Sequence, residues 1–180
     1  MATISNKEAT LLGLLCEKSK HAYEIEMDIE NRDMRYWTEI SMSSVYKLLK
    51  KLEERKLLES EVKLSQNNVA HRIYSVTELG KKQFKEKLKT FVSKCQPVKY
   101  PVDVGLANLT LLDKEEAVAH LQKYAESIDG LIKCYKELEE FLINEKCSLA
   151  NVQLATRRLY LMKAEKRWIT KFLEEFAGSE

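Results

Sequence analysis

The chain has 180 residues and a mass of 21.0 kDa, which suits one or two small domains. Hydrophobic residues make up 44% and charged residues 32%, and five glycines with two prolines are too few for an all-β protein. The longest apolar run, residues 11–16, is much shorter than a membrane-spanning helix requires. The first ten residues lack the basic and apolar regions of a signal peptide. We therefore expect a helical, soluble, cytoplasmic protein without a membrane partner.

Cysteines and histidines are scattered, and no pair has the spacing of a zinc site or of a disulfide framework. The four cysteines are Cys16, Cys95, Cys134 and Cys147. We expect free thiols, no metal and no cofactor, although a redox role stays open for Cys95 or Cys147 near the ends of expected elements.

Motifs for catalysis are missing from the sequence. It contains no glycine-rich phosphate loop, no nucleophile elbow and no His-Glu-x-x-His segment. Acidic pairs such as Glu53-Glu54 lie on lysine-rich helical segments, where ion pairing one turn apart explains them. We expect that the chain is not an enzyme.

Charge divides the chain into two halves. Residues 1–95 carry 18 Lys+Arg and 14 Asp+Glu, a balance of +4, whereas residues 96–180 carry 12 and 14, a balance of −2. Pro97 and Pro101 fall at this boundary, where proline cannot continue a helix. We predict domains over residues 1–95 and 96–180, of which the first meets a polyanion.

Hydrophobic periodicity in the first half is helical, then β, then helical. We predict helices over about residues 4–15, 21–29 and 41–55, strands over 57–64 and 71–76, and a fourth helix capped by Thr77. The polar segment SQNNVA supplies the turn between the strands, with Asn67 and Asn68 as turn formers. Three helices followed by a hairpin is the order of a winged helix-turn-helix domain.

The second half contains two long amphipathic segments. Apolar positions alternate at spacings of three and four from Ala117 to Leu142 and again from Val152 to Phe176, with Lys166 intruding. The last segment has a second apolar stripe, which favours a second copy of the chain as partner. We therefore expect a mainly α fold with a small β-hairpin, whose C-terminal domain of two long helices forms a homodimer. The expected dimer contacts are Leu131, Tyr135, Leu159, Leu161, Trp168 and Phe172.

The third helix has the pattern of a recognition helix. Its apolar back consists of Val45, Leu48, Leu49 and Leu52. The expected DNA-binding residues are Ser43, Ser44, Tyr46, Lys47, Lys50 and Lys51 on this helix, with His71 and Arg72 on the hairpin. Other interpretations stay open for these residues. The lysines could form an ordinary solvated helix face. Tyr46 could be a core residue, and His71 could be an exposed strand residue.

Three stretches together resemble the PadR family of bacterial transcriptional regulators: HAYEI at 21–25, SMSSVYKLLKKLEERKLLES at 41–60 and HRIYSVTELG at 71–80. The residues that match the family pattern are Tyr23, Ser44, Tyr46, Leu49, Leu52, Glu53, Leu57, Arg72, Tyr74, Thr77 and Gly80. The second half resembles the helical dimerisation region of that family, in its virulence-activator-like form. Family glycines are replaced by Ala22, Ser43 and Lys56, which leaves the fold unchanged where the backbone φ is negative.

The resemblance implies a homodimeric repressor that binds an inverted-repeat operator in double-stranded DNA. It also implies relief of repression by a small, often aromatic, effector. The alternative from another class is a helical adaptor that binds protein through its heptad stripe and has no affinity for DNA.

Overall fold

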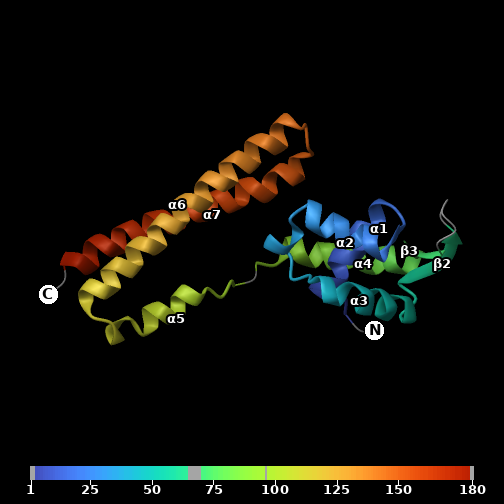
Figure 1. Ribbon diagram of the computed structural model, residues 1–180, viewed down its shortest axis with the longest axis horizontal. Helices are drawn as coiled ribbons and strands as arrows, with labels where there is room; N and C mark the ends of the chain where they lie inside the picture. Colours follow the sequence, from blue (N-terminus) through green and yellow to red (C-terminus); the bar gives the residue numbers. More distant parts are fainter. Residues whose placement is uncertain (1–2, 65–69, 96, 179–180) are drawn as a thin grey trace. The chain divides into compact units, whose positions relative to one another are not determined.

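The structure is a computed structural model that describes residues 3–64, 70–95 and 97–178. The chain forms two compact units, Met1–Pro97 and Val98–Glu180 (Figure 1). The first contains α1 (Asn6–Glu17), β1 (Lys20–His21), α2 (Ala22–Asn31), the 3₁₀ helix η1 (Met34–Tyr36), α3 (Met42–Glu54), β2 (Leu58–Leu64), β3 (Ala70–Val76) and α4 (Glu78–Ser93). The second contains α5 (Pro101–Ala107), the 3₁₀ helix η2 (Leu109–Leu111), α6 (Lys114–Asn144) and α7 (Leu149–Gly178).

The first unit confirms the expected winged helix-turn-helix. Its antiparallel sheet has the order β1-β3-β2, and β2 and β3 form the hairpin, called the wing below. The segment SQNNVA falls on residues 65–70, so Asn67 and Asn68 lie outside the described residues. The strand β1 was not expected, because two residues are too few to show an alternating pattern.

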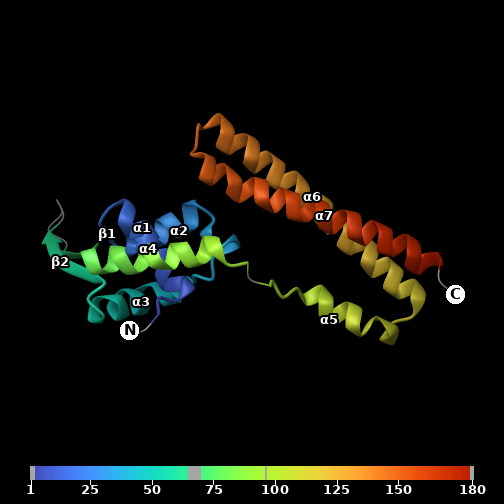
Figure 2. The same ribbon diagram turned by 180° about the vertical axis from the view of Figure 1, so that it is seen from behind.

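The core of the first unit gathers apolar side chains of α1, α2 and α3 over one face of the sheet. Caps begin these helices where the sequence places them. Ser5 and Glu8 form a capping box on α1, and His21 and Glu24 form another on α2. The helix α4 lies along α1, and its Phe84 packs against the same core (Figure 2). Four helices and the sheet therefore share one core.

Gly80 permits a close approach between α4 and the chain segment before the wing. A Cβ atom on Gly80 would lie 2.2 Å from the carbonyl oxygen of Leu57. The same oxygen accepts hydrogen bonds from the backbone N–H of Thr77 at 3.1 Å and from its hydroxyl at 3.2 Å. Thr77 also caps α4, as expected, by accepting the N–H of Gly80 at 3.0 Å.

One replaced family glycine, at the end of α3, does not have the negative φ that was expected. Lys56, which stands where the family has glycine, has a φ of 58° and so lies in the left-handed region. The N–H of Leu57 donates to the carbonyl of Leu52 at 2.9 Å, which closes the turn in the manner of a Schellman motif. Lysine therefore occupies a strained position that glycine adopts freely.

The second unit is built on the antiparallel pair α6 and α7. Leu121, Ala125, Ile128 and Ile169 form its buried cluster, against which residues of α5 and η2 pack. Polar contacts follow the same interface: the Tyr124 hydroxyl donates to Glu165 Oε1 at 2.9 Å. Burial, together with this bond, raises the pKa of Tyr124 to about 12. The two long helices agree with the heptad prediction.

The helix α5 was not predicted. The segment CQPVKYP indicates an extended connector, yet Pro101 is the first residue of a helix of seven residues. Proline fits the first helical position, because its missing N–H would have no partner there and its φ suits a helix. The sequence thus places Pro101 in the connector, whereas in the structure Pro101 begins the helix that follows it.

Candidate nucleic-acid interface

The helix α3 has the two faces expected of a recognition helix. Val45, Leu49 and Leu52 are fully buried in the core of the first unit. Tyr46, Lys47 and Lys50 are exposed on the opposite face. Tyr46 is therefore not a core residue, and its hydroxyl is available to an outside partner.

Ser44, at the start of α3, differs from this group. The Ser44 hydroxyl donates to the carbonyl of Ser41 at 2.6 Å and accepts its backbone N–H at 3.2 Å. Ser44 therefore completes the N-terminal cap of α3. The sequence predicted a DNA contact for Ser44 and not this capping role. The side chain of Ser43 lies outside the described part of the chain.

Lys51 lies on the flank of α3 that faces α1. Its Nζ is 3.0 Å from Oε1 of Glu8, a carboxylate that is 1% exposed and also accepts a hydrogen bond from Arg55 at 3.0 Å. Burial alone raises the pKa of Glu8, but the hydrogen bonds from the Ser5 N–H, Lys51 and Arg55 outweigh it and lower the pKa. Lys51 therefore anchors α3 to α1, and less of its charge is available to a phosphate.

Glu53 connects the last turn of α3 to both strands of the wing. Its Oε2 is 3.6 Å from Nη1 of Arg72 on β3, and its other oxygen accepts a hydrogen bond from the Ser60 hydroxyl on β2. The guanidinium of Arg72 nevertheless stays largely exposed. The structure thus places Arg72 beside the last turn of α3.

His71 lies on the other face of the wing. Its ring stacks on His21 with a centroid distance of 4.8 Å, so it is half-buried and not a freely exposed strand residue.

Glu8 and Glu53 hold Lys51 and Arg72 in place, and the sequence did not predict this role for either of them. Glu53 falls in the matched family pattern, but no local spacing connects it with Arg72, and none connects Glu8 with Lys51.

Residues 11–86, from within α1 into α4, match the Transcriptional regulator PadR-like family. Over these residues, the chain is similar to the PadR-like regulators. PadR of Bacillus subtilis in complex with operator DNA is 18% identical, with 94% of this chain and 98% of that chain covered and a TM-score of 0.77. The same protein with p-coumaric acid is 18% identical, with 96% and 99% covered and a TM-score of 0.75.

A third solved structure, the virulence activator AphA of Vibrio cholerae, is 18% identical, with 94% of this chain and 97% of that chain covered and a TM-score of 0.66. These likenesses show a shared fold that includes the C-terminal helices. The match over residues 11–86 supports a DNA-binding transcriptional regulator rather than an enzyme. This assignment favours the DNA-binding interpretation over a helical adaptor.

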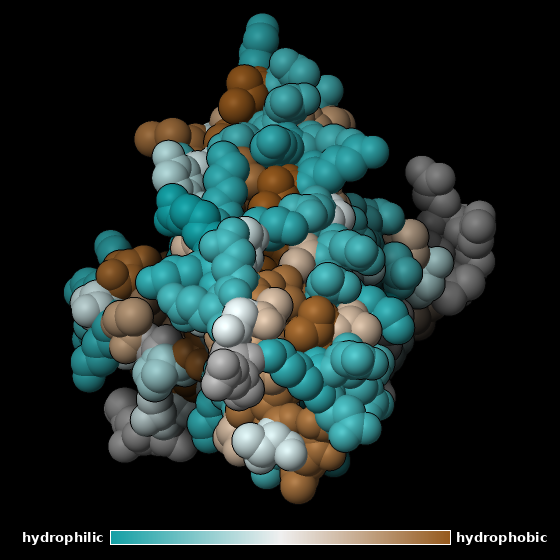
Figure 3. Space-filling model, turned by 90° about the vertical axis from the view of Figure 1, so that its left-hand side faces the viewer, coloured by the Kyte–Doolittle hydropathy of each residue, from teal (hydrophilic) through white to brown (hydrophobic). Residues whose placement is uncertain are grey.

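The residues expected to join two copies of this chain divide into two groups. Leu131, Leu161 and Trp168 are exposed, and Tyr135 is half-buried. Leu159 is buried inside the single chain, and Phe172 packs against its buried cluster. Leu159 lies in the alternating stripe of α7 that faces α6. It therefore belongs to the contact between these two helices within one chain, and its assignment as a dimer contact is corrected. Exposed apolar side chains also appear among hydrophilic ones in Figure 3.

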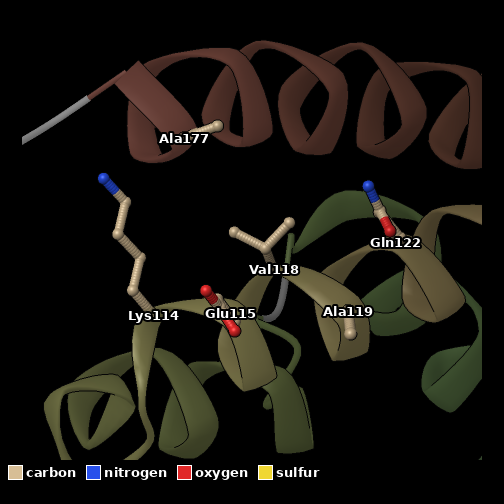
Figure 4. A pocket seen from close by; sticks show the side chains of 6 residues that line it. All are labelled: Lys114, Glu115, Val118, Ala119, Gln122 and Ala177. Atoms are coloured by element: carbon tan, nitrogen blue, oxygen red, sulfur yellow. The ribbon is translucent and has the colours of Figure 1, made fainter.

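The second unit has a surface depression at one end of its helix pair. A shallow groove lies between the first turns of α6 and the last turn of α7 (Figure 4), lined by Lys114, Glu115, Val118, Ala119, Gln122 and Ala177. Within residues 3–64, 70–95 and 97–178, no three metal-ligating side chains gather as a metal site. Over the same ranges, no helix is both long and apolar enough to cross a membrane. All four cysteines are free thiols.

Proposed function

We propose that the chain is a homodimeric repressor that binds an inverted-repeat operator with α3 and the wing of each copy. The observation that carries the proposal is the exposure of Tyr46, Lys47 and Lys50 on the face of α3 opposite its buried residues. Arg72 of the wing lies beside Glu53 in the last turn of the same helix. A recognition helix needs a fixed apolar back and polar or basic groups that reach base edges and phosphates. In this proposal the protein acts in the cytoplasm, where a bacterial promoter lies.

The second copy is proposed to cover the exposed stripe of α7. Leu154, Leu161 and Trp168 recur once per heptad in a stripe beside the one that buries Ala155 and Ile169. Stripes with this period pack against a partner helix. Because the two copies are related by a two-fold axis, their recognition helices meet inverted half-sites.

An effector is proposed to weaken the binding of this dimer to its operator. The support is the shared fold with PadR of Bacillus subtilis, a protein solved with operator DNA and with p-coumaric acid. For this chain we accordingly propose a small aromatic ligand. Its addition is expected to lower operator affinity without changing the dimer.

The test uses duplexes that flank the gene of the protein itself. Footprinting first locates the operator, and a gel shift then compares it with variants in which about 5 bp, half a helical turn, is inserted between the half-sites. We expect the insertion to abolish simultaneous engagement and to weaken binding strongly. Unchanged binding after the half-turn insertion would contradict a dimer that binds with both winged domains at once. Equal binding to all duplexes would contradict recognition of a specific operator.

A further inference from the structure

Positive charge in the second unit is concentrated on one of its two long helices. The helix α7 carries six Lys and Arg and three Glu, a balance of +3, whereas α6 carries four Lys and seven Asp and Glu, a balance of −3. The two helices pack against each other through their apolar sides (Figure 2). The excess of positive charge on α7 lies mainly on sides that α6 leaves open.

Four of these cations and one tyrosine form a stripe along α7 at spacings of three and four residues. This basic stripe consists of Arg157, Tyr160, Lys163, Arg167 and Lys171, and all five residues are exposed. Arg157 and Lys171 take the heptad position opposite the buried side of α7. The apolar stripe with Leu161 and Trp168 lies on the other side of that position. A dimer formed through the apolar stripe therefore leaves the basic stripe open.

Like charges follow one another along the basic stripe. Lys163, Arg167 and Lys171 recur four residues apart, a spacing at which like charges repel each other and destabilise a helix. No acidic residue stands three or four positions before or after Arg157, Lys163 or Arg167. Among the described residues, none of these three has an ion pair within 4.0 Å, and Lys171 pairs with Glu175 at 3.5 Å. The stripe thus keeps most of its charge for a partner.

Exposed lysines of α4 show the ordinary alternative. Lys81 pairs with Glu78 at 2.7 Å and Lys89 with Glu86 at 2.6 Å, each across one turn of the same helix. Such pairs stabilise a helix and reduce the charge that a solvated surface presents. The basic stripe of α7 lacks this neutralisation at three of its four cations, so a solvated helix face does not explain its pattern.

We propose that the basic stripe of α7 is a second DNA site, which holds the phosphate backbone of a duplex segment other than the operator half-sites. The inference rests on the proposed function for the choice of DNA as the polyanion. A rise of 1.5 Å per residue places Arg157 and Lys171 about 21 Å apart along the helix, a length over which a duplex presents many phosphates. A bound backbone would relieve the repulsion within the stripe, and Tyr160 offers a hydroxyl to the same phosphates.

The composition of the basic stripe favours a nucleic acid over a protein partner. The core of a protein–protein interface is depleted of charged residues, whereas protein–DNA interfaces are polar and strongly positive. Tyr160 is the one large side chain of the stripe with an apolar ring, and its other four members are cations. Phosphate contacts carry no sequence information, so this site should accept duplexes of any sequence.

The test asks whether a dimer bound to one duplex captures another. An operator duplex just long enough for both half-sites is immobilised and saturated with the full chain. A labelled duplex of unrelated sequence is then added at several salt concentrations. The variants are Arg157→Gln/Arg167→Gln, which removes two charges, and Arg157→Lys/Arg167→Lys, which keeps them. The matched control is Lys133→Gln/Lys136→Gln, which removes two charges from exposed positions of α6.

We expect the wild type, the lysine variant and the control to capture the labelled duplex. The glutamine variant should capture it with a salt slope shallower by about 1.8 for each copy that contacts the duplex, and about 100-fold more weakly at 50 mM salt. All four proteins should bind the short operator with equal affinity. Circular dichroism checks that the helices of each variant are intact.

Several outcomes overturn the inference. Absence of capture by the wild type, or equal capture by the glutamine variant, would show that the basic stripe is not a DNA site. Loss of operator affinity in that variant would show that the stripe contacts the operator itself. A change in its sedimentation without DNA would show that the acidic helix α6 of a second copy covers the stripe instead. If the wild type prefers no sequence, the proposed function has failed, and any short immobilised duplex in place of the operator still tests the stripe.

Discussion

Nζ of Lys51 on the recognition helix α3 lies 3.0 Å from Oε1 of Glu8, a buried carboxylate of α1. A lysine whose sequence position predicts a DNA contact is thus part of the contact between two helices. Glu8 also accepts hydrogen bonds from Arg55 and from the Ser5 N–H. The orientation of α3 therefore depends on one acidic side chain that no DNA-binding motif would indicate.

Glu8→Gln is expected to lower the free energy of unfolding by about 2 kcal/mol near neutral pH, because the variant removes charged hydrogen bonds. Folding lowers the pKa of Glu8 below its ordinary value of 4.5. Its contribution to stability is therefore complete above that value and disappears as the pH falls through the lower folded pKa. Urea unfolding at neutral and at acid pH measures the difference.

The control for this variant is Glu61→Gln, which removes an exposed carboxylate paired with Lys63. It should change stability by less than about 1 kcal/mol. An equal destabilisation by Glu8→Gln at neutral and at acid pH would contradict the role given to its charge.

Lys50→Gln and Lys51→Gln should differ in DNA binding. The side chain of Lys50 is 80% exposed, and its Nζ is as far as 4.0 Å from Oε1 of Glu54. Lys50 is therefore available to a phosphate. Its removal is expected to make the salt slope shallower by about 0.9 for each phosphate that the protein no longer neutralises. Lys51→Gln should change the slope less and lower the unfolding free energy. Equal changes in slope would show that Lys51 leaves Glu8 when DNA binds.

Gly80→Ala is expected to destabilise the first unit by about 2–3 kcal/mol, because the new methyl group collides with the Leu57 carbonyl oxygen. Gly130→Ala on α6 is the matched control, since no atom lies within 4 Å of its added Cβ. That control should stabilise α6 by about 1 kcal/mol or less. Thermal unfolding of both variants distinguishes the crowded glycine from the open one.

Lys56→Gly should stabilise the protein by about 1 kcal/mol, because glycine adopts a φ of 58° without the penalty of a Cβ atom. Lys146, with a φ of 54° just after α6, offers the same gain in the second unit. Lys63→Gly in β2 is the control and should destabilise, since its strand position gains nothing from glycine. Urea midpoints that fall for Lys56→Gly would refute the strain at this turn.

A Leu161→Gln/Trp168→Gln variant is expected to be monomeric in sedimentation and to lose operator affinity. Each residue is 37% exposed in the single chain, and circular dichroism must show that the fold survives the change. Val104→Gln on α5 replaces an exposed apolar residue outside the stripe and should remain dimeric. A dimeric Leu161→Gln/Trp168→Gln variant with normal DNA binding would place the dimer contact elsewhere.

Sequence periodicity predicted the elements that bury one continuous stripe. Val45, Leu49 and Leu52 recur at helical spacing, so α3 and its exposed face follow from the sequence alone. The strand β1 and the helix α5 escaped prediction because two and seven residues are too short to show a period.

The candidate site was predicted less completely. Exposed residues such as Tyr46 and Lys50 follow from the helical wheel, but pairs such as Glu8 with Lys51 join positions far apart in the chain. Such contacts are set by tertiary packing, which local spacing does not encode. The same limit explains Leu159, whose heptad position fits a partner helix in either the same chain or a second copy.

The lysine in the apolar stripe of α7 has a consequence for how the helical hairpin assembles. Nζ of Lys166 lies 2.6 Å from Oδ2 of Asp129 and 3.3 Å from the carbonyl oxygen of Ala125 on α6. A slip of α7 by one heptad would bring Leu159 or Leu173 opposite Asp129. It would also leave the ammonium group opposite Gln122 or Lys136, neither of which is a carboxylate. The repeating pattern alone permits several such alignments, and this ion pair selects one of them.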